Sequence, residues 1–205
     1  MCGARQRHDR SVKVLVIGAS GTLGGAVAEA LADSHEVVRA ARSGPVRVDL
    51  ADMDSLDALF AEVTGLDAVV CCAASGPLVD LQQVSDVEFA AGLHDKLLGQ
   101  VALARRAIHS VRDGGSITLT AGTFVSPLAG GSLGALVNSG LEGFVRNAAA
   151  ELPRGLRINA VSPGWISETL AKLGMDASDG TPAADVAKTY VAAVEGVSQG
   201  QVFRP

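Results

Sequence analysis

The stretch over residues 11–43 constrains the fold of this chain more than any other. A run of mostly β-branched apolar residues, 12–17, leads directly into Gly18, Gly21 and Gly24, and an alanine-rich segment follows the glycines. An uninterrupted apolar run is typical of a strand buried on both faces, and the apolar spacing of the alanine-rich segment is typical of a helix. The sequence therefore predicts a strand, a glycine turn and a helix in that order.

This order gives the three glycines a specific meaning. In dinucleotide-binding folds the first glycine permits a tight turn, the second lets a pyrophosphate approach the backbone, and the third lets the helix pack on the strand. The free N–H groups and the positive end of the helix dipole then face the phosphates. A glycine-rich turn in another kind of α/β protein is the alternative. The expected phosphate contacts are Gly18, Ser20, Gly21, Thr22, Leu23 and Gly24.

Strands alternate with helices along the rest of the chain, which favours a parallel, doubly wound sheet. The further strands are expected over residues 36–41, 46–48, 66–72, 116–120, 156–161 and 200–204. The further helices are expected to begin at Asp52 or Asp54 and to cover about residues 85–111, 133–152 and 182–194. Residues 1–10 are polar and basic without periodicity, so we expect a flexible tail followed by one domain over residues 11–205.

The composition narrows the class of partner. A net charge of −5 without runs of Lys or Arg argues against a nucleic-acid surface and favours a small-molecule substrate. The chain shows no apolar stretch of membrane-spanning length and no apolar signal segment, so we expect a cytoplasmic protein without a membrane partner. Cys71 and Cys72 would point to opposite faces of a strand and are expected to be buried thiols. The four histidines are scattered, so no metal site is expected.

Three motifs besides the glycine turn carry a resemblance to a known family. They are Asp49-Leu50 after the third strand, Leu-Glu-Gly-Phe-Val-Arg over residues 141–146, and Arg-Ile-Asn-Ala-Val-Ser-Pro-Gly over residues 157–164. With them the chain resembles the short-chain dehydrogenase/reductase family over nearly all of residues 12–203. The resemblance implies a Rossmann-type doubly wound parallel sheet of strand order 3-2-1-4-5-6-7. The G-x-x-G-x-x-G spacing is similar to that of the extended and atypical members.

The resemblance also implies a nicotinamide dinucleotide cofactor. In this family the acid after the third strand binds the adenine, and the Pro-Gly after the sixth strand lies beside the nicotinamide. After the second strand, where an acid would favour NAD, the chain has Arg42 and Ser43, which favour the 2′-phosphate of NADP(H). A solvated surface arginine is the alternative for Arg42. The cofactor contacts expected outside the glycine turn are Arg42, Ser43, Asp49, Leu50, Ala73, Ala74, Pro163, Gly164 and Ile166.

The groups that perform hydride-transfer chemistry in the family are replaced in this chain. The resemblance places the usual tyrosine at Gly134, the usual lysine at Asn138, the usual serine at Ala121 and the usual asparagine at Lys96. Lysine and asparagine have thus exchanged positions. We expect the ammonium of Lys96 and the carboxamide of Asn138 to share one pocket as catalytic groups. The alternative is that Lys96 is a solvated helix residue paired with Asp95 or other nearby acids.

Other side chains near the expected site have weaker roles. Thr120, the third catalytic candidate, is expected to orient a substrate together with other hydroxyls of residues 120–132, since an unassisted hydroxyl has too high a pKa to replace the phenol. Tyr190 is expected to pack near the far edge of the sheet, and His94 to lie on the surface. Glu168 occupies the place where the family often has a threonine that touches the cofactor amide.

These observations support one principal function and two alternatives. The principal one is an NADP(H)-dependent oxidoreductase that acts on a small carbonyl compound or alcohol at a rearranged site. The first alternative is an inactive protein that binds or senses NADP(H), or a subunit of an assembly. The second is that the helices over residues 85–111 and 133–152 serve oligomerisation beside a vestigial nucleotide site. A homodimer or homotetramer through these two helices is expected in the principal case as well.

Overall fold

The computed structural model describes residues 11–73, 76 and 78–205. Its strands are β1 (Lys13–Ile17), β2 (Glu36–Ala41), β3 (Val46–Arg47), β4 (Leu66–Cys71), β5 (Val111–Thr120), β6 (Arg157–Val161) and β7 (Val202–Phe203). Its α-helices are α1 (Thr22–Ala32), α2 (Met53–Glu62), α3 (Asp86–Leu93), α4 (Gly99–Ser110), α5 (Ser132–Ala148), α6 (Ser167–Lys172) and α7 (Ala183–Glu195). The expected tail over residues 1–10 and the expected cofactor contact of Ala74 lie outside the described residues.

The strands form one parallel sheet in the order β3-β2-β1-β4-β5-β6-β7. This confirms the predicted fold class and the predicted strand order. β1 pairs with β2 on one side and with β4 on the other, so the connections run in opposite directions from the centre of the sheet. In open α/β sheets this reversal opens a crevice at the carboxyl ends of the strands, where ligands bind.

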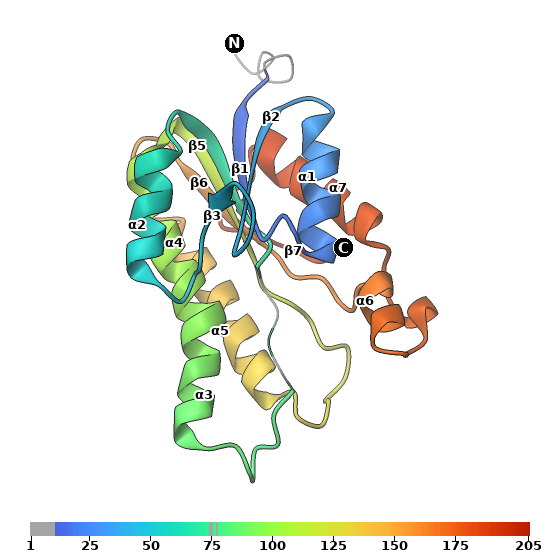
Figure 1. The fold of residues 1–205 in the computed structure, drawn as a ribbon. Helices are drawn as coiled ribbons and strands as arrows, with labels where there is room; N and C mark the ends of the chain where they lie inside the picture. Colours follow the sequence, from blue (N-terminus) through green and yellow to red (C-terminus); the bar gives the residue numbers. More distant parts are fainter. Residues whose placement is uncertain (1–10, 74–75, 77) are drawn as a thin grey trace.

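Helices cover both faces of the sheet (Figure 1). The cluster that packs against α2, α4 and α5 includes Leu15 and Ile17 of β1, and the cluster that packs against α1 and α7 includes Val14 and Val16 of the same strand. All four side chains are at most 1% exposed. Because successive strand residues point to opposite faces, both faces of β1 are buried, which is why its sequence is continuously apolar.

The helix predicted over residues 85–111 is interrupted. A capping box between Ser85 and Glu88 starts α3, and the chain then passes through a π-helical turn, η1 (His94–Leu98), before α4. π-helical turns inside α-helices are rare and occur frequently at functional sites. The turn contains Lys96 and brings it opposite α5.

Two element boundaries also differ from the prediction. β5 begins at Val111 rather than at Ser116, because a register irregularity lets both residues pair with β4. α5 ends at Ala148 rather than near residue 152, since the N–H groups of Ala150 and Glu151 bond three residues back in a tighter turn. Within the described part of the chain, we find no helix with the length and apolar character that crossing a membrane requires.

Candidate functional site

Backbone contacts explain two of the three glycines in the turn between β1 and α1. Gly18 has a φ of +81°, and a Cβ there would stand 2.7 Å from the backbone nitrogen of Ala73. A Cβ on Gly24 would stand 2.0 Å from the carbonyl oxygen of Gly18, so only glycine lets the helix lie this close to the turn. A Cβ on Gly21 would meet only that same carbonyl oxygen, at 3.3 Å, which leaves its outer side open.

The first turn of α1 presents free backbone donors. Its N-cap is Gly21, no side chain caps the helix, and no acid lies in the first turn. The first N–H group that bonds back belongs to Gly25, so the N–H groups of residues 22–24 have no partner among the described residues. Together with the positive end of the helix dipole, these groups favour the binding of an anion at this helix end.

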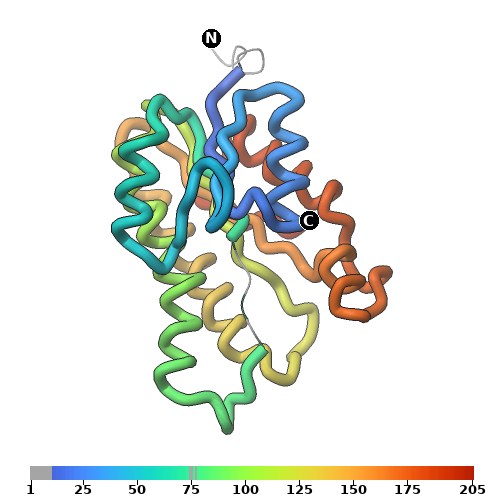
Figure 2. The backbone as a smooth tube through the Cα atoms, in the orientation of Figure 1, coloured from blue at the N-terminus to red at the C-terminus, as the bar shows by residue number. Residues whose placement is uncertain are grey.

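A lysine that the sequence analysis missed lies at this helix end. Lys172, the last residue of α6, donates from Nζ to the hydroxyl of Thr22 at 2.6 Å. Figure 2 shows how the chain returns so that α6 lies below α1 on the same side of the molecule. A cation at a helix N-terminus is unfavourable unless an anion joins it. Thr22 and Lys172 lie 150 positions apart in the sequence, so no local motif predicts this contact.

The groups expected around the adenosine follow β2 and β3. Arg42 and Ser43 are exposed at the end of β2, and Arg42 has no ion-pair partner among the described residues. One carboxylate oxygen of Asp49 accepts from the N–H of Ala51 at 3.0 Å, and the backbone N–H of Asp49 donates to Ser55. Leu50 is 8% exposed, so its side chain belongs to the core.

The ends of β5 and β6 continue side by side beyond the sheet. The N–H of Ala121 donates to Val161, and the N–H of Thr123 donates to the carbonyl of Pro163 at 2.8 Å. The next residue, Gly164, would have open space around a Cβ. Ile166 is 9% exposed and forms a bridge with residue 181. The expected contacts Pro163, Gly164 and Ile166 therefore border the carboxyl end of the sheet.

The structure brings Lys96 and Asn138 together. Lys96 donates from Nζ to Oδ1 of Asn138 at 2.9 Å and to the carbonyl oxygen of Ala121 at 3.3 Å. Burial lowers the pKa of Lys96 to about 8, although the nearby Cys71 acts in the opposite direction. Among the described residues Lys96 makes no salt bridge, so the alternative of a solvated lysine paired with Asp95 is wrong.

An aromatic ring covers the position of the usual tyrosine. A Cβ on Gly134 would stand 3.1 Å from Cζ of Phe124, and a Cβ on Gly131 would meet the same ring at 3.4 Å. Phe124 lies in the loop between β5 and α5, whose sequence gives no sign of where the ring packs. Replacing Gly134 by tyrosine would therefore require Phe124 to move.

Thr120 and Tyr190 differ from what was expected. The Thr120 side chain is 2% exposed, and its hydroxyl bonds the carbonyl oxygen of Cys71 and, at 2.6 Å, the hydroxyl of Tyr190. The hydroxyl of Thr120 is thus buried and satisfied, so the structure contradicts a substrate-orienting role. Tyr190 is a packing residue as expected, but it packs against the central strands with Val14 and Val70, and its placement near the far edge was wrong.

The two remaining expectations concern Glu168 and His94. Both carboxylate oxygens of Glu168 accept from the N–H of Ala183, at 3.2 and 3.0 Å, at the start of α7. Its carboxylate therefore caps α7. The expectation that Glu168 stands in for the family's cofactor-contacting threonine did not predict this role. His94 is exposed, as expected.

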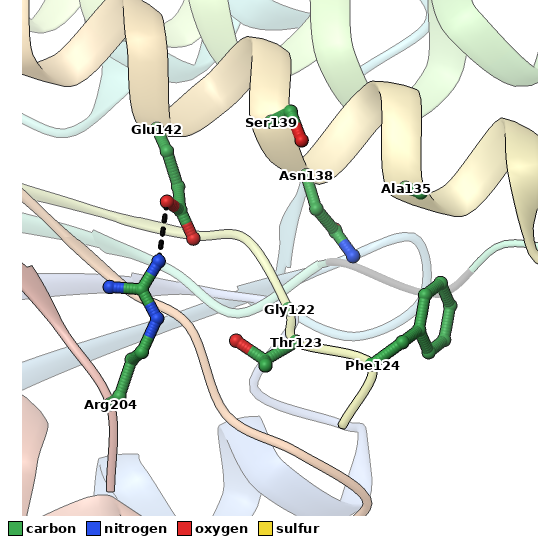
Figure 3. Close-up of a pocket in the computed structure, with 8 residues that line it drawn as sticks. All are labelled: Gly122, Thr123, Phe124, Ala135, Asn138, Ser139, Glu142 and Arg204. Atoms are coloured by element: carbon green, nitrogen blue, oxygen red, sulfur yellow. Dashed lines mark hydrogen bonds and ion pairs between the residues drawn. The ribbon is translucent and has the colours of Figure 1, made fainter. Parts of the chain in front are cut away.

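A pocket of about 230 Å³ adjoins the Lys96–Asn138 pair (Figure 3). It lies between the segment that follows β5, one face of α5 and the end of the chain after β7. The lining residues are Gly122, Thr123, Phe124, Ala135, Asn138, Ser139, Glu142 and Arg204. Of these, Asn138 was named from the sequence as a catalytic candidate, and Thr123 is one of the hydroxyls of residues 120–132 that were expected to orient a substrate.

A buried carboxylate organises one wall of this pocket. Glu142 is 9% exposed and accepts from Ser162 at 2.9 Å, from Arg146 at 2.9 Å and from Arg204 at 2.6 Å. Burial raises its pKa, but the hydrogen bonds from Ser162 and Arg146 and the charge of Arg204 outweigh burial, so the pKa of Glu142 is lowered. Thr123 extends the chain of hydroxyls with a 2.9 Å contact to the Ser162 hydroxyl.

Comparison with known proteins agrees with this architecture. A family model described as enoyl-(acyl carrier protein) reductase matches residues 2–195. The solved structure of the protein lin1944 from Listeria innocua is 37% identical, with a TM-score of 0.89 over 95% of this chain and 99% of that chain. A small-chain dehydrogenase in complex with NADPH is 24% identical, with a TM-score of 0.83 over 96% of this chain and 97% of that chain.

A short chain dehydrogenase from Burkholderia cenocepacia J2315 in complex with NADP is 23% identical, with a TM-score of 0.79 over 95% of each chain. None of the curated proteins matches the sequence. The family model covers most of the chain, and the solved structures share its sheet and its helices. The chain therefore belongs to the short-chain dehydrogenase/reductase family.

Proposed function

We propose that this protein is an NADP(H)-dependent oxidoreductase that acts on a small carbonyl compound or alcohol. The observation that carries the proposal is the partly buried 2.9 Å hydrogen bond between Lys96 and Asn138 at the end of β5. A lysine and an amide are retained together at the family's reaction site, although each has moved to the other's helix. The complexes of two related dehydrogenases with NADPH and NADP support the choice of cofactor.

The residues at the carboxyl edge of the sheet fit a dinucleotide. The glycine turn leaves no room for a Cβ at Gly18 or Gly24, and the free N–H groups of α1 suit the phosphates. Lys172 would add a positive charge there, and the exposed Arg42 would pair with a 2′-phosphate. When bound, NADPH supplies the hydride.

Lys96 and Asn138 would handle the substrate oxygen and its proton. Reduction of a carbonyl compound adds a proton to oxygen while the carbon gains hydride. The pKa of about 8 lets Lys96 hold or release a proton near neutral pH. Because Oδ1 of Asn138 accepts from Lys96, its Nδ2 group is left to donate a hydrogen bond to the substrate oxygen.

A specific observation favours the alternative of NADP(H) binding without turnover. Phe124 fills the space in front of Gly134, so the usual phenol has no place in this site. The two functions differ in one respect: both require a nucleotide site, but only the oxidoreductase requires Lys96.

Fluorescence titrations with NADPH and NADH test the cofactor assignment. We expect NADPH to bind, and we expect Arg42→Ala to weaken NADPH binding by about tenfold or more while NADH binding stays unchanged. Gly21→Trp should block both nucleotides. Arg105→Ala, which removes an exposed arginine from α4, is the control. Equal weakening of both nucleotides in Arg42→Ala would contradict the NADP(H) assignment.

A screen of small carbonyl compounds with NADPH then separates the oxidoreductase from the binding protein. We expect oxidation of NADPH that Lys96→Met abolishes while NADPH affinity changes little. If Lys96→Met still oxidises NADPH with the substrate, the proposal that Lys96 transfers the proton would be contradicted.

Oligomerisation is a further part of the proposal. Leu98 and Leu136, on the two helical segments expected to form the family's dimer, are each 49% exposed. We expect a homodimer or homotetramer in light scattering after size-exclusion chromatography. A strict monomer at micromolar concentration would contradict it.

A further inference from the structure

The pocket beside Lys96 presents one amide donor without a partner among the described residues. Asn138 is 7% exposed, and its Oδ1 is held by Lys96. This contact fixes which end of the carboxamide faces the pocket. Figure 3 shows Nδ2 directed toward Gly122 and Phe124, and no acceptor for it exists among the described residues. Because Nδ2 lines the pocket, it is available to donate to an acceptor on a ligand there.

The opposite wall presents an acceptor. A carboxylate can only accept, so the Ser162 hydroxyl must donate to Oε1 of Glu142. The hydroxyl of Thr123 contacts the carbonyl oxygen of Ser162 at 3.2 Å and its hydroxyl at 2.9 Å, and both contacts require Thr123 to donate its one proton. The lone pairs of Thr123 are therefore left to accept from a ligand in the pocket. The lowered pKa keeps Glu142 ionised, so this chain of hydroxyls orients Thr123 and does not store a proton.

The third group is a cation with unused donors. Arg204 donates from Nη2 to Oε2 of Glu142, the same oxygen that accepts from Arg146. One carboxylate thus serves two guanidinium groups and neutralises neither of them fully. The Arg204 side chain is 50% exposed, and Figure 3 shows it facing Thr123 across the pocket. Its Nε and Nη1 groups have no hydrogen-bond partner among the described residues.

These three groups define the ligand. We propose that the pocket binds the substrate of the proposed oxidoreductase as a small oxo acid or hydroxy acid. The carboxylate pairs with Arg204, and the reacting oxygen accepts from Asn138. In the alcohol form the substrate hydroxyl donates to Thr123, and Phe124 covers the apolar part. The volume of about 230 Å³ lies below the range typical of drug-sized ligands, about 300–1,000 Å³, which fits a small acid.

The proposal rests on the proposed function, but direct binding measurements test it separately. The probes are 2-oxobutanoate, its methyl ester and 2-hydroxybutanoate, titrated by calorimetry and saturation-transfer NMR into the full chain with and without NADP⁺. We expect the acid to bind about tenfold or more tightly than the ester, because only the acid pairs with Arg204.

Matched variants assign this preference to single groups. Arg204→Gln should abolish the preference for acid over ester, Arg204→Lys should keep part of it, and Arg105→Gln should leave it intact. Thr123→Val should weaken the binding of 2-hydroxybutanoate more than the binding of 2-oxobutanoate. Thr64→Val, a control at an exposed position, should change the binding of neither acid. Glu142 keeps Ser162 and Arg146 in all these variants, so folding persists and is checked by the thermal transition.

Two results would overturn the proposal: equal binding of acid and ester to the unmodified protein, or an acid preference that survives in Arg204→Gln. A parallel NADPH titration of the same variants separates this failure from a failure of the proposed function. Arg204→Gln should retain NADPH affinity. If the unmodified protein binds the acid but not NADPH, the function is wrong while the pocket assignment stands.

Discussion

The glycine turn and the Lys96–Asn138 region lie at the same edge of the sheet but follow different rules. The turn depends on backbone contacts, and at Gly18 and Gly24 no residue with a Cβ fits. The Lys96 region depends on side chains that meet across the fold, and there we propose that the family's usual residue types have been exchanged or lost. Backbone geometry at these two glycines tolerates no substitution, whereas a set of side chains can be rearranged around the proposed cofactor site.

Gly24→Ala tests the backbone half of this comparison and should have the largest effect. The new Cβ would stand 2.0 Å from the Gly18 carbonyl oxygen, so α1 must move away from β1. We expect a loss of about 3 kcal/mol or more in the free energy of unfolding, measured with urea. Gly25→Ala is the matched control, because its Cβ meets only Ala19 at 3.7 Å and alanine favours the helix. Equal stability of the two variants would contradict the backbone argument.

Lys96→Met tests the side-chain half through the pH dependence of stability. Folding lowers the pKa of Lys96 from 10.5 to about 8, so between these values the unfolded chain binds the proton more tightly. The stability of the unmodified protein relative to Lys96→Met should therefore rise as the pH increases above about 8. The full change is on the order of 3 kcal/mol. Urea unfolding of both proteins between pH 7 and pH 10 measures it, and a difference independent of pH would show that Lys96 is not buried as a cation.

Lys172→Gln has the smallest expected effect. It tests which part of the proposed dinucleotide lies beside Lys172. Its ammonium is exposed beside Thr22, so we expect NADPH and NADH binding to weaken equally, by about threefold to tenfold. Fluorescence titration measures both nucleotides, with Lys188→Gln on α7 as the control. Selective loss of NADPH alone would place Lys172 at the 2′-phosphate rather than at the helix end.

The sequence predicts the structure correctly where a local pattern fixes a local geometry. Apolar runs and glycines predicted a parallel sheet, and the family resemblance predicted its strand order and the meeting of Lys96 and Asn138. Prediction from the sequence fails where the position of a side chain depends on packing between residues far apart in the chain. Thr120 was expected to orient a substrate, but its hydroxyl bonds the hydroxyl of Tyr190, which lies in α7, 70 positions away in the sequence. Nor does any local signal join Glu142 to Arg204, which the sheet brings together from positions 62 apart.

The central claim is that Lys96 belongs to the same site as the bound cofactor although its neighbours have changed. The most direct measurement is an NMR pH titration of the protein with ¹³C-labelled lysine side chains, with and without NADP⁺, in which Lys96→Met assigns the resonance. We predict that the Lys96 resonance titrates at about pH 8 and shifts when NADP⁺ is added. A Lys96 resonance that titrates in the ordinary lysine range and ignores the nucleotide would contradict the claim.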